Sequence, residues 1–218
     1  MEKPCLSLKY KIVIKNKDGE IIKEYEKDAR SFVKNFLMAL YSSLINGTVS
    51  LVDVNGNTIT NTGIIGVWSN NWCNSGRASW CNGGTMKLGC AGYLELNAPE
   101  GNDSYGIVVG TGATPVSPDD YKLEQKIPHG SGDNQLYYQK TSVGKPNVSD
   151  GKIKLTISRV FRNDGSVDLN INEVGLQVLV KDTSNNTYCV LIVRDVLPQT
   201  ETIPGDGGVM IVTYSIST

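Results

Sequence analysis

The sequence predicts a mainly β protein, an antiparallel β-sandwich of the jelly-roll or immunoglobulin-like type. Three observations support this class. The C-terminal part, Lys152 to Thr218, alternates segments rich in Val, Ile, Leu and Thr with the turn sequences RNDGS, KDTSNN and PGDGG. The first strand-like segment, 6–15, alternates apolar and polar residues. One segment, 32–44, repeats apolar residues at helical spacing, and we expect it to be the one amphipathic helix of the chain.

The overall composition predicts one domain without a nucleic-acid or membrane partner. A chain of 218 residues can bury one large core, so we expect a single β-sandwich domain over 1–218. The net charge of −1 and the pI near 5.9 argue against nucleic-acid binding, which requires a clustered basic surface. No apolar segment reaches the roughly 20 residues of a membrane span, and the N-terminus lacks the apolar core of a secretory signal. We expect a protein that is made and assembled inside a cell, or one that leaves by a route without such a signal.

The N-terminal region, 5–46, predicts a hairpin followed by the helix. Period-two alternation in 6–15 indicates a half-buried strand, and 20–26 returns as a second strand after an Asn/Asp/Gly turn. The apolar stripe of the helix is expected to pack on the sheet, with a partner-binding helix as the alternative. A second hairpin is expected around Asn55-Gly56, a pair that favours the left-handed backbone of a tight turn.

The segment 61–92 differs in composition from the rest of the chain, and we expect an elaborated loop or insertion there. Long Gly/Asn-rich sequence cannot build a core by itself. The segment holds all three tryptophans and three of the five cysteines: Trp68, Trp72, Trp80, Cys73, Cys81 and Cys90. The tryptophans predict either a small core over one end of the sandwich or an interface or ligand-binding loop. A disulfide among the three cysteines is expected if the compartment is oxidising, with free thiols as the alternative.

Short strands and turns are expected between this insertion and the C-terminal strands. Residues 94–110 read as strand, Asn/Gly turn, strand, and 135–143 is a further candidate strand. Ser117 is a good start for a helical turn that continues to Leu123. The run 107–112 superficially resembles a phosphate-cradling loop, but it lacks the Gly-Lys-Ser/Thr ending and the third glycine of the known phosphate motifs. We therefore expect a plain turn.

No constellation of residues in the sequence predicts catalysis, a metal or a cofactor. The chain has no C-x-x-C and no G-x-S-x-G, and His129 is its only histidine. His129 lies in a Pro/Gly-flanked loop with no assigned acid or nucleophile. The acidic residues Asp119-Asp120 and Asp164/Asp168 do not match a spaced calcium loop. We expect a protein that is not an enzyme, with capping and turn formation as the roles of these acids.

One charged side chain is expected to point into the core. On 153–161 the apolar face also carries Arg159, and on the next strand the apolar phase slips at Glu173. A buried arginine requires a partner. We predict a structural ion pair between Arg159 and Glu173 that holds the sandwich in register, with Arg194 and Asp195 as a competing pair.

Three blocks of the sequence resemble virion structural proteins of tailed phages and related viruses. The blocks are 106–127, 158–178 and 194–217, which carry the short motifs V-G-T-G with D-Y-x-L, N-E-x-G-L, and R-D-x-L-P with V-T-Y-x-I. The helix SFVKNFLMALYSSL is similar too, whereas the insertion at 61–92 departs from the shorter linker of that group. The resemblance implies a component of the virion, such as a tail, collar, fibre-base or capsid-decorating protein. It implies copies of the chain and other virion proteins as partners, and no catalytic residue.

Two other functions compete with this one. The first is an extracellular or cell-surface fibre or surface-layer subunit that polymerises by strand donation. The second is a carbohydrate-binding module in which the tryptophans of 61–92 stack on a host-surface glycan. For assembly, we expect the terminal strands Leu6–Lys15 and Val209–Ser217 to be edge strands, which offer unpaired backbone to a neighbouring subunit.

Overall fold

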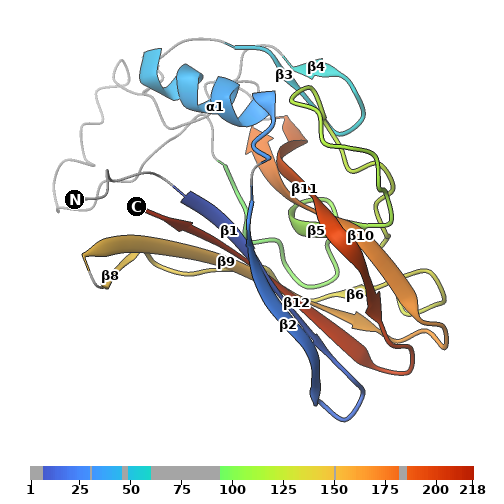
Figure 1. The fold of residues 1–218 in the computed structure, drawn as a ribbon. Coiled ribbons are helices and arrows are strands. Elements are labelled where there is room, and N and C mark those ends of the chain that lie inside the picture. The colour runs from blue at the N-terminus through green and yellow to red at the C-terminus, as the bar shows by residue number, and fades with distance from the viewer. Residues whose placement is uncertain (1–6, 30, 46–48, 60–93, 150, 182–185) are drawn as a thin grey trace, which may run out of the picture.

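The computed structural model describes residues 7–29, 31–45, 49–59, 94–149, 151–181 and 186–218. These residues form twelve β-strands and one α-helix, and every ladder between the strands is antiparallel (Figure 1). The predicted mainly β class is therefore confirmed. The predicted insertion at 61–92 lies outside the described residues.

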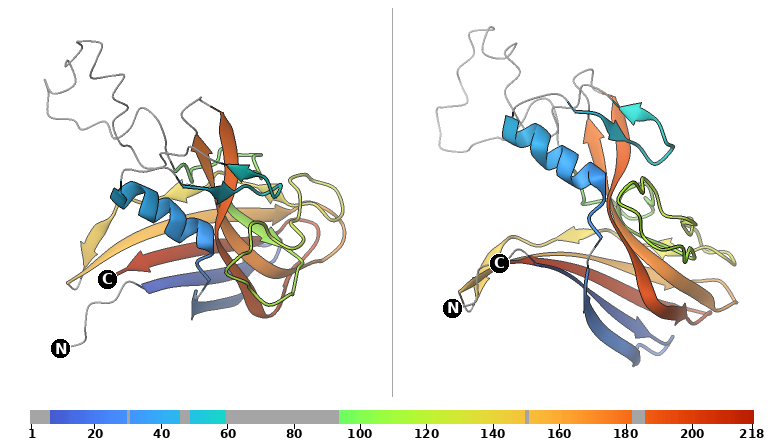
Figure 2. Two further views of the ribbon diagram at one scale, coloured as in Figure 1. Left: turned by 90° about the horizontal axis from the view of Figure 1, so that it is seen from above. Right: turned by 45° about the horizontal axis from the view of Figure 1, so that its top comes forward.

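The larger sheet has the strand order β2-β1-β12-β9-β6, and the short strands β7 and β8 also pair with β9 (Figure 2). Its strands are β1 (Ser7–Lys15), β2 (Ile21–Asp28), β6 (Tyr137–Tyr138), β7 (Ser142–Val143), β8 (Asn147–Ser149), β9 (Lys152–Asn163) and β12 (Gly208–Ser217). Every second residue of β1 is buried, which confirms the predicted period-two strand. The predicted N-terminal hairpin corresponds to β1 and β2.

The predicted edge strands are wrong. Strands β1 and β12 pair with each other over their whole lengths, and β2 and β9 cover their other sides. Both terminal strands are therefore central in the larger sheet: β1 pairs with the following strand β2 and with the distant β12, and β12 pairs with two distant strands, β1 and β9. The edges of the sheet are β2 at one end and the short strands β6, β7 and β8 at the other.

The smaller sheet consists of three strands in the order β11-β10-β5. They are β5 (Gly106–Gly110), β10 (Leu169–Lys181) and β11 (Thr187–Ile203). The pairing of β10 with β11 shifts register between Ile171 and Glu173, where the sequence predicted a slip of the apolar phase. A second shift lies between Leu176 and Gln177. Both shifts place a polar side chain of β10 at a point where the regular ladder is interrupted.

The helix α1 (Lys34–Ile45) lies against β11, beside a small sheet of β3 (Leu51–Val52) and β4 (Thr58–Ile59) (Figure 1). The buried Asn35 fastens these elements together. Its Nδ2 donates hydrogen bonds to the carbonyls of Val52 (2.9 Å) and Leu191 (3.3 Å), and its Oδ1 accepts one from the N–H of Val52 (3.1 Å). No described helix is long and apolar enough to span a bilayer.

The apolar core includes buried side chains of the larger sheet, of the smaller sheet and of α1. The larger sheet contributes aromatic and aliphatic residues such as Ile12, Phe161 and Val212, and the smaller sheet contributes Val174 and Val193, all without solvent exposure. Burying a side chain of this size stabilises a fold by about 1.5–3 kcal/mol. In the larger sheet, β1 and β12 alternate buried and less buried residues and so present one apolar face, whereas β5 and the middle parts of β10 and β11 are buried at consecutive residues.

Candidate functional site

The buried carboxylate of Glu173 organises the loop that follows β5. Glu173 has no solvent exposure. Its Oε1 accepts hydrogen bonds from the backbone N–H groups of Gly112 (3.1 Å) and Gln125 (2.8 Å). Its Oε2 accepts hydrogen bonds from the N–H of Glu124 (3.1 Å) and from Nε of Arg194 (2.8 Å). Four donors therefore surround one carboxylate, which compensates the cost of burying its charge.

Arg194 on β11 connects this carboxylate to the rest of the loop. The arginine is 2% exposed. Its Nη1 donates to Asp120 Oδ2 at 2.8 Å, and its Nη2 donates to the carbonyl of Thr114 at 3.2 Å. Burial lowers the pKa of Arg194, but the hydrogen bonds to Asp120 and Glu173 outweigh it and raise the pKa above its ordinary value. We call Glu173, Arg194 and Asp120 the carboxylate network.

The Gly-x-Gly run before this loop is explained by the same network. A Cβ atom added at Gly112 would lie 2.5 Å from Glu173 Oε1, and one added at Gly110 would lie 2.6 Å from it. Only glycine lets the backbone approach the carboxylate this closely. The run thus binds a carboxylate of its own protein. The predicted helical start at Ser117 is a single turn, closed by a hydrogen bond from the N–H of Asp120 to the carbonyl of Ser117 (3.1 Å).

Arg159 is fully buried on β9 and binds backbone carbonyls. Its Nε donates to the carbonyl of Gln139 at 2.7 Å, and its Nη1 donates to those of Tyr105 and Ile107 at 2.9 Å each. Its Nη2 donates to two further carbonyls, of Asn102 and Pro99. Burial lowers the pKa of Arg159 to about 10, so the side chain stays charged at neutral pH. This one side chain joins the loop before β5 to the segment after β6.

The predicted ion pair between Arg159 and Glu173 is wrong. The inward direction of Arg159 is as predicted, but its donors meet carbonyls of the loops above the larger sheet. Glu173 lies on β10 of the smaller sheet. Its ion-pair partner is Arg194 on the paired strand β11. Asp195 is not the ion-pair partner of Arg194 in this arrangement. Neighbouring residues of a strand point to opposite faces, and Asp195 instead accepts a hydrogen bond from the Tyr214 hydroxyl (3.0 Å).

The remaining sequence-predicted residues fall into two groups. Trp68, Trp72, Trp80, Cys73, Cys81 and Cys90 lie outside the described residues. His129 has a structural environment: its Nδ1 accepts a hydrogen bond from the N–H of Tyr138 (3.2 Å), and its own N–H donates to Asp103 Oδ2 (2.8 Å). In the part of the chain that the structure describes, no group of three or more His, Cys, Asp or Glu side chains has the arrangement of a metal site.

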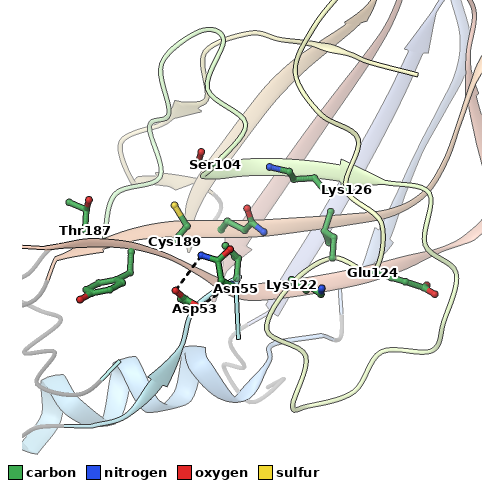
Figure 3. Close-up of a pocket in the computed structure, with 12 residues that line it drawn as sticks. Asp53, Asn55, Ser104, Lys122, Glu124, Lys126, Thr187 and Cys189 are labelled. Carbon is green, nitrogen blue, oxygen red and sulfur yellow. Dashed lines mark hydrogen bonds between the residues drawn. The ribbon is translucent and has the colours of Figure 1, made fainter. Parts of the chain in front are cut away.

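An open pocket of about 740 Å³ lies next to the loop that the carboxylate network holds. Figure 3 shows its lining side chains, which come from the β3–β4 turn, the loop before β5 (Ser104), the loop around 122–126 and the adjoining parts of β10 and β11. The sequence analysis did not predict this pocket. A usable signal would have been the acidic residues Asp120 and Glu124 in the loop after the Gly110-Thr111-Gly112 run, since the backbone N–H groups of such a loop require acceptors.

Two carboxylates beside the pocket hold turns and titrate abnormally. Asp53 Oδ1 accepts hydrogen bonds from the N–H groups of Asn55 (2.9 Å) and Asn57 (2.8 Å). Burial raises the pKa of Asp53, but the hydrogen bonds from Asn57 and Asn55 outweigh it and hold the pKa below its ordinary value. Hydrogen bonds from Thr114 likewise lower the pKa of Glu124.

We expect the protein to lose thermal stability on acidification below about pH 4.5. The ordinary pKa values of Glu124 and Asp53 are 4.5 and 3.8, and both are lower in the folded chain. Their stabilising contribution is therefore complete above these values and is lost as the pH falls through the folded pKa values. Thermal melts recorded from pH 7 to pH 3 measure how steeply the melting temperature falls with pH. The variant Asp53→Asn keeps an oxygen for the two backbone donors, and its melting temperature should fall less steeply; an equal slope would exclude Asp53 as a contributor.

Comparison of the chain with models of protein families, with curated proteins and with solved structures found no match. The function is therefore inferred from the residues of this chain and from the arrangement of its surfaces.

Proposed function

We propose that this chain is a structural subunit of a virus particle that works by assembly, as a tail, collar, fibre-base or capsid-decorating protein. The virion assignment rests on the resemblance of the blocks 106–127, 158–178 and 194–217 to such proteins. We assign the two larger sheets to a β-sandwich, whose jelly-roll or immunoglobulin-like type stays open. Assembly itself rests on one observation: the two edges of the larger sheet are complementary in charge, and both expose apolar side chains.

The β2 edge is acidic. Among the residues that the structure describes, β2 pairs with β1 only, so its outer side has backbone N–H and C=O groups without a described strand partner. The segment 16–28 contains five acidic and three basic residues. One of the basic residues, Lys23, is bound at 2.7 Å to the fully buried carboxylate of Glu201. Glu24 and Glu26 form ion pairs with Lys11 and Lys9 of β1, so the acidic excess of this edge comes from Asp18, Glu20 and Asp28. Two large apolar side chains stand at this edge, with Ile21 56% and Ile22 54% exposed.

The opposite edge is basic. In the described part of the chain, only the short strands β6, β7 and β8 pair with β9 on this side, so the described pairing of this edge is also incomplete. The segment 140–154 contains four lysines and one acidic residue, and all four lysines are exposed. Val143, Val148 and Ile153 are exposed beside them.

These edges fit head-to-tail contact between copies of the chain better than symmetric contact. Two β2 strands paired antiparallel around Tyr25 would place Glu24 opposite Glu26 and Lys23 opposite Lys27, and like charges in these positions repel. An acidic edge against a basic edge attracts and continues the sheet from one copy to the next. A heterologous contact of this kind closes into a ring or extends into a filament.

Charge reversal at either edge is expected to abolish self-association, and mixing the two variants is expected to restore it. Glu24→Lys with Glu26→Lys makes both edges basic, and Lys152→Glu with Lys154→Glu makes both acidic. Each variant alone then meets only like charge, while the mixture alternates opposite edges. Native mass spectrometry and analytical ultracentrifugation at low ionic strength measure the oligomers. Asp119→Lys, at an exposed position away from both edges, is the matched control and should assemble normally.

The result that contradicts the contact is wild-type protein that stays monomeric at all concentrations, or a mixture that stays as dispersed as its components. Negative-stain electron microscopy then tests the virion assignment separately. Rings, tubes or shells that match a part of the source virion support it. Regular assemblies that match no part of the virion would support the proposed contact between copies and contradict the virion assignment.

A further inference from the structure

The open pocket beside the carboxylate network has the size and construction of a ligand site. Its volume of about 740 Å³ falls within the range of about 300–1,000 Å³ that small-molecule sites occupy. Its walls come from separate parts of the chain: the β3–β4 turn, Ser104 before β5, the loop around 122–126, Gln177 of β10 and Thr187–Cys189 of β11 (Figure 3). Two of them, the β3–β4 turn and the loop around 122–126, are held in place by buried or hydrogen-bonded carboxylates. The pocket is thus preformed by the fold.

Gln177 is a largely buried polar side chain that lines this pocket. It lies at the second register shift of β10 and is only 3% exposed. Its side chain lines the pocket. An amide both donates and accepts hydrogen bonds, so it can pair with water or with a ligand there.

The charged side chains around the pocket are equal in number for the two signs, and most of them already form hydrogen bonds within the protein. Two lysines, Lys122 and Lys126, stand with two acids, Asp53 and Glu124. Both acids accept hydrogen bonds from their own turns, and Lys126 Nζ donates to the carbonyl of Asp103 at 2.8 Å. The Lys122 ammonium lies over the Tyr121 ring, 5.7 Å from its centroid, so an ionic ligand would find a single lysine and not a set of free counter-charges. A neutral ligand avoids that cost, because burying an unpaired charge is strongly unfavourable.

The polar groups that line the pocket both donate and accept hydrogen bonds. They are the amides of Asn55 and Gln177 and the hydroxyls of Ser104 and Thr187, with Tyr188 as an aromatic wall. Sugar hydroxyls also both donate and accept, and the apolar face of a sugar ring packs on an aromatic side chain. Burial raises the pKa of the Cys189 thiol, which therefore adds no charge.

We infer that this pocket binds a neutral sugar residue, with Gln177 as the buried hydrogen-bonding group that recognises its hydroxyls. The ligand class is a neutral glycan. The pocket lies on the smaller sheet and the β3–β4 turn, whereas the proposed assembly contact uses the edges of the larger sheet. Sugar binding and self-association are therefore separable properties of the chain.

Titration of the wild-type protein with four neutral sugars tests this site. The probes are glucose, galactose, mannose and N-acetylglucosamine, with N-acetylneuraminate as the anionic comparison, and saturation-transfer NMR and calorimetry detect binding. At least one neutral sugar is expected to bind at millimolar concentration and more tightly than the anionic one. Gln177→Met keeps the side-chain length but removes the amide, and it should weaken that binding by about tenfold, equivalent to the loss of one hydrogen bond of about 1.4 kcal/mol.

The matched control is Gln199→Met, which removes an exposed amide of β11 outside the pocket and should bind the sugar like the wild type. Asn55→Ala on the β3–β4 turn provides a second pocket variant if Gln177→Met does not fold. Three results would overturn the inference: no neutral sugar binds, the anionic sugar binds more tightly, or the folded pocket variants bind as well as the wild type. Oligomer size measured on the same variants should be unchanged, which separates this test from that of assembly.

Discussion

Replacing Arg159 with methionine is expected to lower the free energy of unfolding by about 5 kcal/mol, the largest effect of any single substitution considered. The arginine donates hydrogen bonds to five backbone carbonyls in the interior. Methionine fills a similar space but donates nothing, so these carbonyls lose their shared donor. Because ordinary domains are stable by only about 5–15 kcal/mol, the variant should be largely unfolded or close to it. Urea titration followed by circular dichroism measures the loss.

Two comparisons make this result specific to the carbonyl contacts. Arg159→Lys retains the charge but has a single nitrogen, which cannot reach carbonyls on both sides of the guanidinium, so a smaller loss is expected. Arg162→Met changes an arginine of the same strand that pairs with Asp164 near the surface, and it should cost less than about 1 kcal/mol. Equal losses at Arg159 and Arg162 would contradict the role assigned to the buried contacts.

Replacing Glu173 with glutamine is expected to cost about 3–5 kcal/mol of unfolding free energy. Both carboxylate oxygens accept two hydrogen bonds, one of them from the guanidinium of Arg194. Glutamine replaces one oxygen with an NH₂ group, which would face two donors, and it leaves the buried charge of Arg194 with Asp120 as its main partner. The loop between Gly112 and Gln125 should therefore lose protection from amide hydrogen exchange at the same time.

Glu124→Gln is the matched control for this substitution. Glu124 also accepts several hydrogen bonds, but these contacts all use its Oε2 and the side chain is partly exposed, so an amide can turn its own oxygen to the same donors. A loss below about 1 kcal/mol is expected. A double-mutant cycle between Glu173→Gln and Arg194→Met should show strong coupling. Additive effects would mean that the two residues do not act as one network.

Several features of the fold follow from local sequence patterns. The alternation in β1 predicts a strand with one buried face, and the slip of the apolar phase at Glu173 predicts the register shift that is present in β10. The inward direction of Arg159 follows from its place on the apolar face of β9. These predictions succeed because the direction of a side chain on a strand depends on its position in that strand alone.

Other features depend on which distant segments meet. The sequence places Leu6–Lys15 and Val209–Ser217 at the ends of the chain, yet β1 and β12 are central because they pair with each other. Likewise, the partner of Glu173 is Arg194, since the antiparallel register of β10 and β11 brings those two residues together. The periodicity of a strand does not specify which strand it pairs with, because the same alternation of apolar and polar residues suits many neighbouring strands.

By itself, then, the sequence determined the strands, the helix, the buried face of each and the absence of a recognisable catalytic motif, all of which depend on short-range spacing. Only the tertiary structure decided the edges of the larger sheet, the partners of the buried arginines and the pocket around Gln177. Each of these requires contacts between residues far apart in the chain. Their energy comes from exclusion of water and from hydrogen-bond geometry in three dimensions, which local spacing does not specify.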